Sequence, residues 1–588
     1  MTRVRVLSED LTNKIAAGEV VDRPASVVKE LIENSIDAGA DKITVILKDG
    51  GTSLIQIVDN GMGMDREDAI LSLQRHTTSK ISTYDDLHNI HTLGFRGEAL
   101  ASIASISRME LKTITQGNTE GSLIRLDGGV IEDVVTAAGV RGTSISVKNI
   151  FFNTPARRKF LKSNEAEYRR IISTLSRFTI YYFQIEFSLY HNDQLIFEYK
   201  STTPENRLID VLGARYRDKV IAVNEDTNFM RVTGFIGKQD ATKKSRGNQY
   251  LYLNGRYIVN RSLNHAIVSA YGTIIPRDEF PLYVIMLELE PRRVDVNVHP
   301  SKMEVKFSDE RLIYGILRNS VKNTLTNANI IPSFTFNNDP KSPDLIRSPH
   351  GTQTNIPLNE YQRARSYDIG QLITPDQIPD AKEPPESEIT VEKSDDSSVF
   401  ERKNVWQIHK RYILSEIRSG IIIIDQHVAH ERILYERALQ NFEKRKPSTQ
   451  QLLFPIIYDL TPEDYSILNE ILVYLEHLGF IIKGFGGNTV VIEGIPSDLR
   501  LGNKETVLTE IIDEYKKNLN NSIDLRDNLA KSFSCKAAIK AGDKLTLAEM
   551  NSLIDQLFAT QSPYFCPHGR PVIINISIDE LDKRFHRT

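Results

Sequence analysis

The sequence predicts a mixed α/β (α+β) protein with three folded units and one long linker. Short apolar runs suited to strands alternate with segments of helical periodicity in the first half of the chain. A stretch of about 70 residues near the middle loses this pattern, and strand and helix patterns then return up to the C-terminus. With 588 residues, 40% of them hydrophobic, the chain is long enough for several domains.

Charge and cysteine content narrow the class of protein. Lysine and arginine total 73, aspartate and glutamate total 77, and the net charge is −4. This balance argues against a uniformly basic nucleic-acid coat protein but leaves room for local basic patches. The sequence has no run of 18 apolar residues and no apolar signal core near its start, so we expect a soluble cytoplasmic protein without a membrane partner. Two cysteines, Cys535 and Cys566, exclude a disulfide framework.

The first two folded units are expected over residues 1–215 and 216–331. In the first unit, strand-like runs at Ile43–Leu47, Leu54–Val58 and Thr143–Val147 alternate with helical segments. The second unit ends in a run from Val294 to Val298, where valines alternate with polar residues as in a half-buried strand.

The linker is predicted over residues 332–398 and the last folded unit over residues 399–588. Between Ile331 and Phe400 lie nine of the 23 prolines, with an excess of acidic residues and serine, so this stretch cannot bury enough apolar surface to order itself. Beyond it, a strand at Ile421–Ile424 leads into a helix, and a strand at Val572–Ile576 closes the chain. A helical insert is expected at about 445–525.

A nucleotide site is predicted near the N-terminus. Glu30 and Asn34 stand four residues apart in a segment of helical periodicity and therefore project from one helix face. A carboxylate and an amide placed in this way can hold a water molecule and a metal ion side by side. The sequence has no P-loop, so the prediction is ATP hydrolysis at a site of another kind.

Two further stretches complete this predicted site. Asp59 follows an apolar strand and can accept a hydrogen bond from the exocyclic amine of adenine, while Gly61 and Gly63 let the backbone come close to the base. Residues 76–98 are rich in hydroxyl groups and glycine, which suits a segment of backbone N–H groups around phosphates.

These stretches carry a family resemblance. The sequence resembles the MutL family of DNA mismatch repair proteins, within the GHKL ATPase superfamily of gyrase, the ninety-kilodalton heat-shock chaperone and sensor histidine kinases. The motifs fill nearly all of residues 8–165 in the family's order; they are Ile15–Val21, Arg23–Leu31, Asp59–Met64, Gly94–Leu100, Gly142–Thr143 and Asn149–Leu161. The resemblance implies a GHKL-type ATPase sandwich followed by a transducer subdomain with a ribosomal S5-like fold.

The resemblance also implies roles for single residues. Glu30 would be the general base for water, Asn34 the Mg²⁺ ligand and Asp59 the adenine reader. Glu33 is the rival base, but it projects about 100° away from the face of Asn34. Lys302 would reach the terminal phosphate from the second unit, with a solvated surface lysine as the alternative. The other expected ATP contacts are Gly61, Gly63, Thr78, Ser79, Lys80, Gly94, Phe95, Arg96, Gly97 and Thr143.

A metal site is predicted in the C-terminal unit. Its candidate ligands combine thiolate, imidazole and carboxylate groups, which suits Zn²⁺, with Mn²⁺ or Mg²⁺ at a more oxygen-rich position. They are Asp425, His427, Glu431, Cys535, Cys566 and His568. We expect Asp425 and His427 to share one face of an extended backbone because they are two residues apart.

The same segments resemble the endonuclease motifs of nicking MutL proteins, namely Asp425–Glu436, the stretch around Cys535, Cys566–Pro571 and Phe585–Arg587. Val428 and Ser534 depart from the family pattern by small changes away from ligand atoms. The resemblance implies DNA nicking with Asp425 and Glu431 as catalytic residues. A structural zinc that only holds the dimer is the alternative, and Glu436 is either a ligand or a support for one.

Partners follow from the resemblance and from short motifs. The family implies a homodimer working downstream of the mismatch sensor MutS, and its rival is a non-nucleolytic matchmaker that uses ATP only as a switch. Gln450–Pro455 resembles a sliding-clamp-binding peptide, with a buried segment of the insert as the alternative. Basic clusters at Arg157–Lys159 and Lys243–Arg246 could neutralise phosphates of double-stranded DNA without reading sequence.

Overall fold

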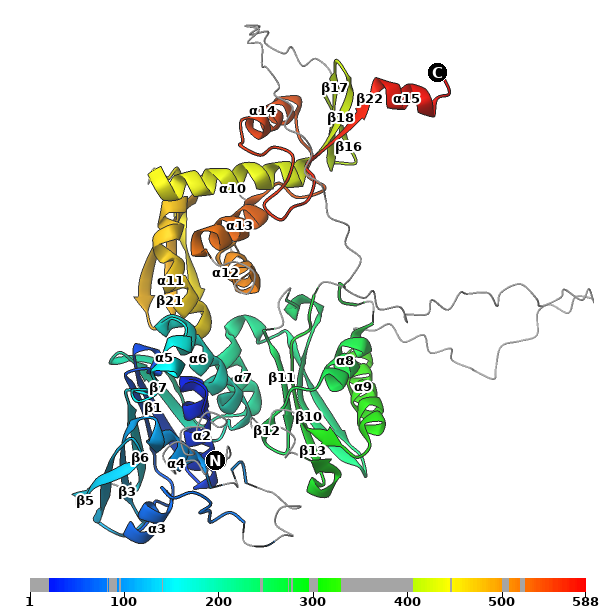
Figure 1. Ribbon diagram of the computed structural model, residues 1–588. Coiled ribbons are helices and arrows are strands. Elements are labelled where there is room, and N and C mark those ends of the chain that lie inside the picture. The colour runs from blue at the N-terminus through cyan, green and yellow to red at the C-terminus, as the bar shows by residue number, and fades with distance from the viewer. Residues whose placement is uncertain are drawn as a thin grey trace, which may run out of the picture. The chain divides into compact units, whose positions relative to one another are not determined.

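The computed structural model describes residues 21–328 and 405–587, apart from 82, 84–91, 95–96, 140, 244–246, 273, 277–278, 296–304, 445–446, 500–506 and 519–523. Helices and strands are mixed in both ranges, which confirms the predicted α/β class (Figure 1). The predicted linker lies outside the described residues. Among the helices described, none is both long and apolar enough to cross a membrane.

An eight-stranded sheet forms the centre of the N-terminal part, in the order β5-β4-β3-β6-β2-β1-β7-β8. Along β1 every second side chain is buried, the pattern of a strand with one well-covered face. The strands are β1 Lys42–Lys48, β2 Leu54–Asp59, β3 Arg108–Ile114, β4 Glu120–Asp127, β5 Val130–Ala138, β6 Gly142–Lys148, β7 Glu186–His191 and β8 Gln194–Tyr199.

Helices pack on this sheet and place the nucleotide motifs. The helix α2 begins with proline in its first turn, where the missing N–H group costs nothing. Its buried residues Val27, Leu31 and Ile32 join one core with the sheet and α6, which leaves the polar face of α2 for the site. The helices are α2 Pro24–Asp37, α3 Arg66–Leu71, α4 Ala99–Ser105, α5 Pro155–Phe160 and α6 Asn164–Tyr181.

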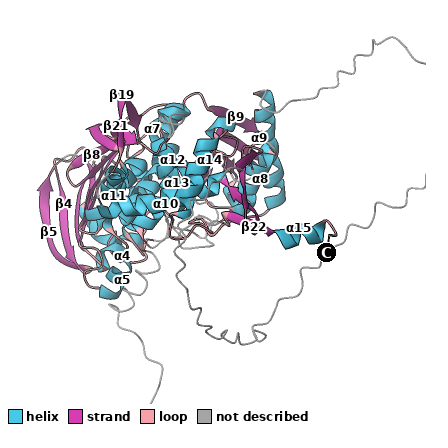
Figure 2. Cartoon of the chain, turned by 90° about the horizontal axis from the view of Figure 1, so that it is seen from above, coloured by secondary structure: helices cyan, strands magenta, loops and turns pink. Residues whose placement is uncertain are grey.

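A second, five-stranded sheet follows in the order β12-β11-β13-β10-β9. Two helices, α8 and α9, lie side by side against it and share its core (Figure 1 and Figure 2). The elements are α7 Pro204–Leu212, β9 Val220–Asp226, β10 Met230–Gly237, β11 Gln249–Leu253, β12 Arg256–Tyr257, α8 Arg261–Tyr271, β13 Tyr283–Leu289, β14 Val294–Asp295, β15 Lys306–Phe307 and α9 Glu310–Asn327.

A shared core joins the two sheets of the N-terminal part. It contains Ile180 of α6 and Leu208 of α7 together with Tyr252 of β11. Beside it the fully buried guanidinium of Arg207 donates hydrogen bonds to carbonyl oxygens of Thr179, Ile185 and Lys200, at 2.7 to 3.0 Å. These bonds serve both terminal nitrogens of the buried cation, so Arg207 ties α7 to the end of α6.

The C-terminal part is built on a four-stranded sheet in the order β16-β17-β18-β22. One face of this sheet packs on α10 and α14 around a core of its own. The elements are β16 Val405–Ile408, β17 Tyr412–Ile417, β18 Gly420–Asp425, α10 Gln426–Lys444, α13 Leu525–Ala537, α14 Leu547–Phe558, β22 Ile573–Ser577 and α15 Ile578–Arg584.

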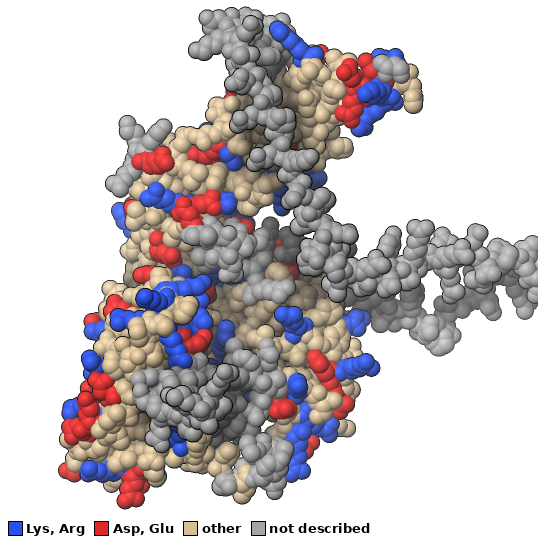
Figure 3. Space-filling model, in the orientation of Figure 1, with Lys and Arg blue, Asp and Glu red and all other residues tan. Residues whose placement is uncertain are grey.

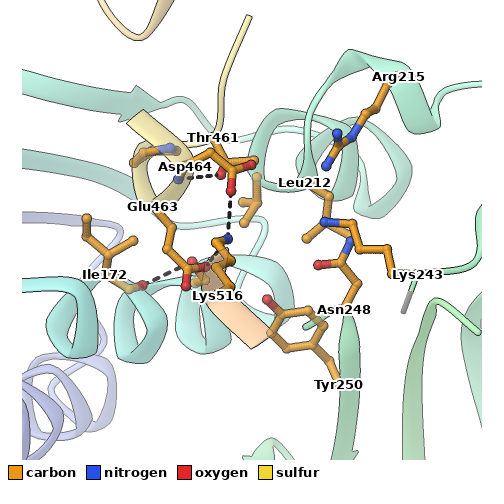
Figure 4. Close-up of a pocket in the computed structure, with 13 residues that line it drawn as sticks. Ile172, Leu212, Arg215, Lys243, Asn248, Tyr250, Thr461, Glu463, Asp464 and Lys516 are labelled. Carbon is orange, nitrogen blue, oxygen red and sulfur yellow. Dashed lines mark hydrogen bonds and ion pairs between the residues drawn. The ribbon is translucent and has the colours of Figure 1, made fainter. Parts of the chain in front are cut away.

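The insert differs from its prediction as a helical region. It contains a three-stranded sheet in the order β19-β21-β20 as well as α11 Pro462–Leu478 and α12 Val507–Asn518. The strands are β19 Thr449–Asp459, β20 Ile481–Gly486 and β21 Thr489–Pro496. Within the insert, Thr461 caps α11 by accepting from the N–H group of Asp464, whose carboxylate binds Lys516 of α12 at 2.6 Å (Figure 4).

Candidate active site and candidate metal centre

The polar face of α2 carries a row of charged and amide side chains. Lys29 Nζ lies 2.8 Å from Glu30 Oε1 and 3.0 Å from Glu33 Oε1, so one ammonium group serves both candidate bases. Glu33 is buried, with 7% of its surface exposed, whereas Glu30 is partly exposed. The carboxylate of Glu30 is therefore the more accessible of the two to a water molecule.

Asp59 ends β2 with its carboxylate held in place. Its Oδ1 accepts from the N–H groups of Gly61 (2.9 Å) and Thr143 (3.2 Å), and its Oδ2 accepts from the hydroxyl of Ser35 on α2 (2.8 Å). These three donors fix the orientation of the carboxylate that is predicted to bind adenine. Ser35 and Thr143 thus hold Asp59, the residue predicted to bind adenine, in position.

The glycines after Asp59 meet the protein's own chain. A Cβ atom on Gly63, whose φ is +70°, would lie 2.1 Å from the carbonyl oxygen of Ile114, and one on Gly61 would lie 2.9 Å from Ala38 Cβ. No side chain fits at these distances, so both positions require glycine. This accounts for the glycine spacing without reference to a bound base.

Two segments predicted to face phosphates lie together. The N–H group of His76 donates to the carbonyl oxygen of Gly97 at 3.0 Å, and a Cβ atom on Gly97 would clash with Thr77. The hydroxyl of Thr78 accepts from the N–H group of Lys80, with Ser79 between them. The predicted phosphate contacts Phe95, Arg96 and Lys302 lie outside the described residues.

Lys80 places a positive charge on the predicted Mg²⁺ ligand. Its Nζ lies 2.9 Å from Asn34 Oδ1 and 2.6 Å from Asp37 Oδ2. The oxygen of Asn34 is thus already oriented toward a cation, and an amide oxygen beside a carboxylate is a donor set that Mg²⁺ accepts. The residues present therefore fit the metal that this kind of ATP site uses.

Asp37 is a residue that the sequence analysis missed. Its carboxylate accepts from the N–H groups of Leu93 (2.9 Å) and Gly94 (3.0 Å) as well as from Lys80. It thereby ties the segment around Gly94 to α2, one turn beyond Asn34. Its spacing of three residues from Asn34 puts it on the same helix face, and this signal was present in the sequence.

Three of the predicted metal ligands converge in the C-terminal part. Ligand atoms of Glu431, Cys566 and His568 all lie within 4.8 Å of one another, and His568 Nδ1 is 3.0 Å from Glu431 Oε1. Glu431 comes from α10, whereas the other two come from the loop before β22. One carboxylate, one thiol and one imidazole form a donor set that fits Zn²⁺ and is open to a further ligand.

Electrostatics at this group favour the thiolate of Cys566 and the protonated ring of His568. Burial alone would raise the pKa of the Cys566 thiol, but hydrogen bonds from His568 and from the N–H group of Arg570 outweigh it and lower that pKa. Hydrogen bonds to Cys566 and Glu431 raise the pKa of His568 to about 9. The positively charged ring of His568 therefore lies between the thiolate of Cys566 and the carboxylate of Glu431, and a metal ion that replaced its proton would bind the same two groups.

Asp425, His427 and Cys535 are described residues outside this three-residue group, and their role as ligands stays a prediction. The expectation of an extended backbone was wrong, because β18 ends at Asp425 and α10 begins at Gln426. Asp425 instead caps the helix, accepting from the N–H groups of His427 (2.9 Å) and Val428 (3.1 Å).

The ring of His427 is oriented by the backbone of Ile539. Its Nδ1 lies 2.8 Å from the carbonyl oxygen of Ile539, so Nδ1 donates to that oxygen and Nε2 is the ring nitrogen outside this bond. This is the arrangement that carbonyl groups impose on metal-binding histidines. The neighbouring Gln426 is fully buried and donates to the carbonyl oxygen of Lys410 at 2.8 Å, which fixes the start of α10.

Glu436 supports the metal-site loop. Its carboxylate accepts from the N–H groups of Gln561 (2.8 Å) and Ser562 (3.3 Å) and binds Arg432 on its own helix at 2.9 Å. These contacts hold the chain just before Cys566 against α10. The structure therefore favours the second of the two roles considered for Glu436, as a support for a ligand.

The predicted sliding-clamp peptide lies in β19 and is exposed. Leu453 is 95% exposed and Phe454 85% exposed. Pairing of β19 with β21 is interrupted between Gln451 and Ile456, which turns these two side chains outward. The alternative reading as a buried segment of the insert is therefore wrong for these two apolar residues.

The structure describes only part of the two basic clusters predicted to contact DNA, Arg157–Lys159 and Lys243–Arg246. Arg158 and Lys159 are exposed on the short helix α5, whereas Lys244–Arg246 lie outside the described residues. Figure 3 shows basic and acidic side chains interspersed over one face of the molecule. Contact of these clusters with a phosphate backbone stays a prediction.

Three family descriptions match this chain. Residues 22–150 match "Histidine kinase-, DNA gyrase B-, and HSP90-like ATPase", residues 208–326 match "DNA mismatch repair protein, C-terminal domain", and residues 405–545 match "MutL C terminal dimerisation domain".

Curated relatives align over the whole chain. DNA mismatch repair protein MutL of Chlorobaculum tepidum is 43% identical and that of Chloroherpeton thalassium 40% identical, each over 100% of both chains. Among solved structures, the Aquifex aeolicus MutL ATPase domain complexed with ADP is 26% identical with a TM-score of 0.35, covering 46% of this chain and 94% of that one.

Proposed function

This chain belongs to the MutL family of DNA mismatch repair proteins, with an ATPase domain and a dimerisation domain, and from this premise we propose a nicking, ATP-dependent matchmaker. The protein couples mismatch recognition by MutS to later repair steps, and its C-terminal part cuts one DNA strand. Its place of action is the cytoplasm, at the nucleoid.

ATP hydrolysis is assigned to the face of α2. Glu30 orients the attacking water, Asn34 would hold Mg²⁺, which would supply neutralisation of phosphate charge, and Asp59 binds adenine. This assignment is supported by the accessible position of Glu30 and by the ammonium group of Lys80, which lies 2.9 Å from Asn34 Oδ1. Positioning and charge neutralisation are what phosphoryl transfer to water mainly requires.

DNA nicking is assigned to the C-terminal centre, and the convergence of Glu431, Cys566 and His568 is the single observation that carries it. These residues would hold Zn²⁺ or Mn²⁺, which would supply Lewis-acid stabilisation of a phosphodiester. Asp425 and His427 stand at the first turn of the same helix as Glu431, from which they can add a more oxygen-rich position.

The homodimer is assigned to the open face of the four-stranded sheet. Trp406, Leu414, Ile423 and Ile574 are direct cross-strand neighbours and form one apolar row on this face. Trp406 is 54% and Ile574 57% exposed. An apolar row of this kind marks an interaction surface, and a second copy of the dimerisation domain is the partner that covers it.

Plasmid nicking tests the nuclease assignment. With Mn²⁺ and supercoiled plasmid, the wild-type protein is expected to produce open circles, and Asp425→Asn is expected to lower the nicking rate by about 100-fold. Asparagine also caps helices, so α10 should stay folded in this variant. Intact plasmid with every divalent metal would instead support the non-nucleolytic matchmaker, whose C-terminal metal is only structural.

Contact with a sliding clamp is assigned to Gln450–Pro455. Replacing Leu453 and Phe454 by alanine is expected to weaken clamp binding at least about 30-fold, because exposed apolar anchors of this kind carry most of the energy of peptide docking. The melting temperature should not change, since both side chains are already exposed. Biolayer interferometry with the purified clamp measures the effect. Ile457→Ala, at a 63% exposed position just beyond the peptide, serves as the control and should bind normally.

A further inference from the structure

The turn between β11 and β12 touches both parts of the N-terminal region. On one side, Asn254 binds the backbone of Leu289 through its side chain, at 2.8 and 2.9 Å. On the other side, the hydroxyl of Tyr182, just past α6, donates to the carbonyl oxygen of Gly255 at 3.3 Å. Gly255 has a φ of +86°, and a Cβ atom there would lie 3.1 Å from that hydroxyl. The turn therefore fits closely against the ATPase domain.

Arg256 follows this turn and extends from the second subdomain to the nucleotide site. Its guanidinium donates to the carbonyl oxygen of Thr92. Burial lowers the pKa of Arg256, and the nearby carboxylates of Glu33, Asp37 and Glu30 oppose that change. The guanidinium thus lies among the acidic groups of α2 while it binds the segment beside Gly94.

A continuous set of contacts leads from Arg256 to the predicted Mg²⁺ ligand. Thr92 Oγ1 donates to the carbonyl oxygen of Gly94 at 2.7 Å, and the N–H group of Gly94 donates to Asp37. Asp37 binds Lys80, whose ammonium group lies on Asn34. Each step is a hydrogen bond or an ion pair, so a shift of the Thr92–Gly94 segment must alter the bond made by Arg256.

We propose that Arg256 is a positioning residue that couples the nucleotide site to the β11–β12 turn of the second subdomain. It holds the Thr92–Gly94 segment against α2, and nucleotide that rearranges this segment changes the anchorage of the turn. The Arg256 contact keeps the segment in place beside Asp37 before nucleotide arrives, so its loss also weakens nucleotide binding. The inference rests on the ATP-binding part of the proposed function.

Hydrogen exchange and nucleotide binding test this coupling in the full-length protein. A non-hydrolysable ATP analogue with Mg²⁺ is expected to change amide protection in residues 251–257 of the wild type. Arg256→Met should abolish that change and weaken analogue binding about tenfold, the effect of losing one charge-assisted hydrogen bond. Arg256→Lys keeps the charge and should recover part of the affinity. Arg231→Met, at an exposed position of β10 in the same subdomain, should match the wild type.

The outcomes separate the inference from the proposed function. If the wild type does not bind the analogue, the ATP assignment itself fails. If it binds but residues 251–257 do not respond, or if Arg256→Met binds and responds normally, the coupling role is wrong. A lower melting temperature with unchanged affinity would reduce Arg256 to a structural contact. Should Arg256→Met not fold, the wild-type exchange and Arg256→Lys still decide.

Discussion

Replacing Glu30 by glutamine should lower the rate of ATP hydrolysis by about 100-fold to 10,000-fold while ATP binding persists. A positioned general base contributes an effect of this size, and glutamine keeps the shape of the side chain but cannot accept the proton of water. Phosphate release in the steady state measures the first effect. Equilibrium binding of an ATP analogue measures the second.

Glu33→Gln is the matched control for this prediction. Glu33 contacts the same lysine, Lys29, but is buried. We expect this variant to keep most of the hydrolysis rate and to lose stability, because Lys29 then has one carboxylate fewer in a largely buried setting. Loss of hydrolysis in Glu33→Gln with a normal rate in Glu30→Gln would reverse the assignment of the base.

Local periodicity was sufficient to predict the elements around the nucleotide site. The apolar spacing over residues 27–36 predicted α2, and alternation or apolar runs predicted β1, β2, β6 and β18 within one or two residues. These segments are decided by which face is buried, and that information lies within a few residues. The mixed fold class followed from them.

The insert shows where periodicity fails. Residues 461–518 are rich in leucine and isoleucine, and short apolar runs suit a buried strand as well as a buried helix. In β21 the β-branched residues at 489–492 and the neighbouring glycines favour a strand, and pairing with β19 settles it. The spacing of Asp425 and His427 was also misread. An extended backbone was expected through both residues, but Asp425 ends β18 and caps α10, so His427 already lies in the helix.

Contacts between distant segments could not be read from the sequence. Arg256 binds Thr92 across 164 positions, and only the close turn at Gly255 brings them together. The grouping of Glu431 with Cys566 and His568 was predicted from chemistry and family resemblance, yet the sequence offered no way to separate these three from Asp425, His427 and Cys535. Distances decide such questions, and they depend on the whole fold.

Replacing Cys566 by alanine should remove the metal bound by Glu431, Cys566 and His568 and abolish nicking. Changes outside the immediate ligands typically weaken metal binding by about 10-fold to 100-fold, and loss of a thiolate ligand should cost at least as much. Elemental analysis of the full-length protein, dialysed against dilute Zn²⁺, should find about one ion fewer per chain than in the wild type.

Cys535→Ala provides the matched comparison, because it removes the chain's other sulfur from a residue on α13 outside the three-residue group. If one metal is held by the group alone, this variant keeps its zinc and its nicking activity. If Asp425, His427 and Cys535 complete a second position, it loses nicking while Glu431, Cys566 and His568 keep their ion. Unchanged metal content and activity in Cys566→Ala would contradict the assignment, because the ion would then be held without the sulfur of Cys566.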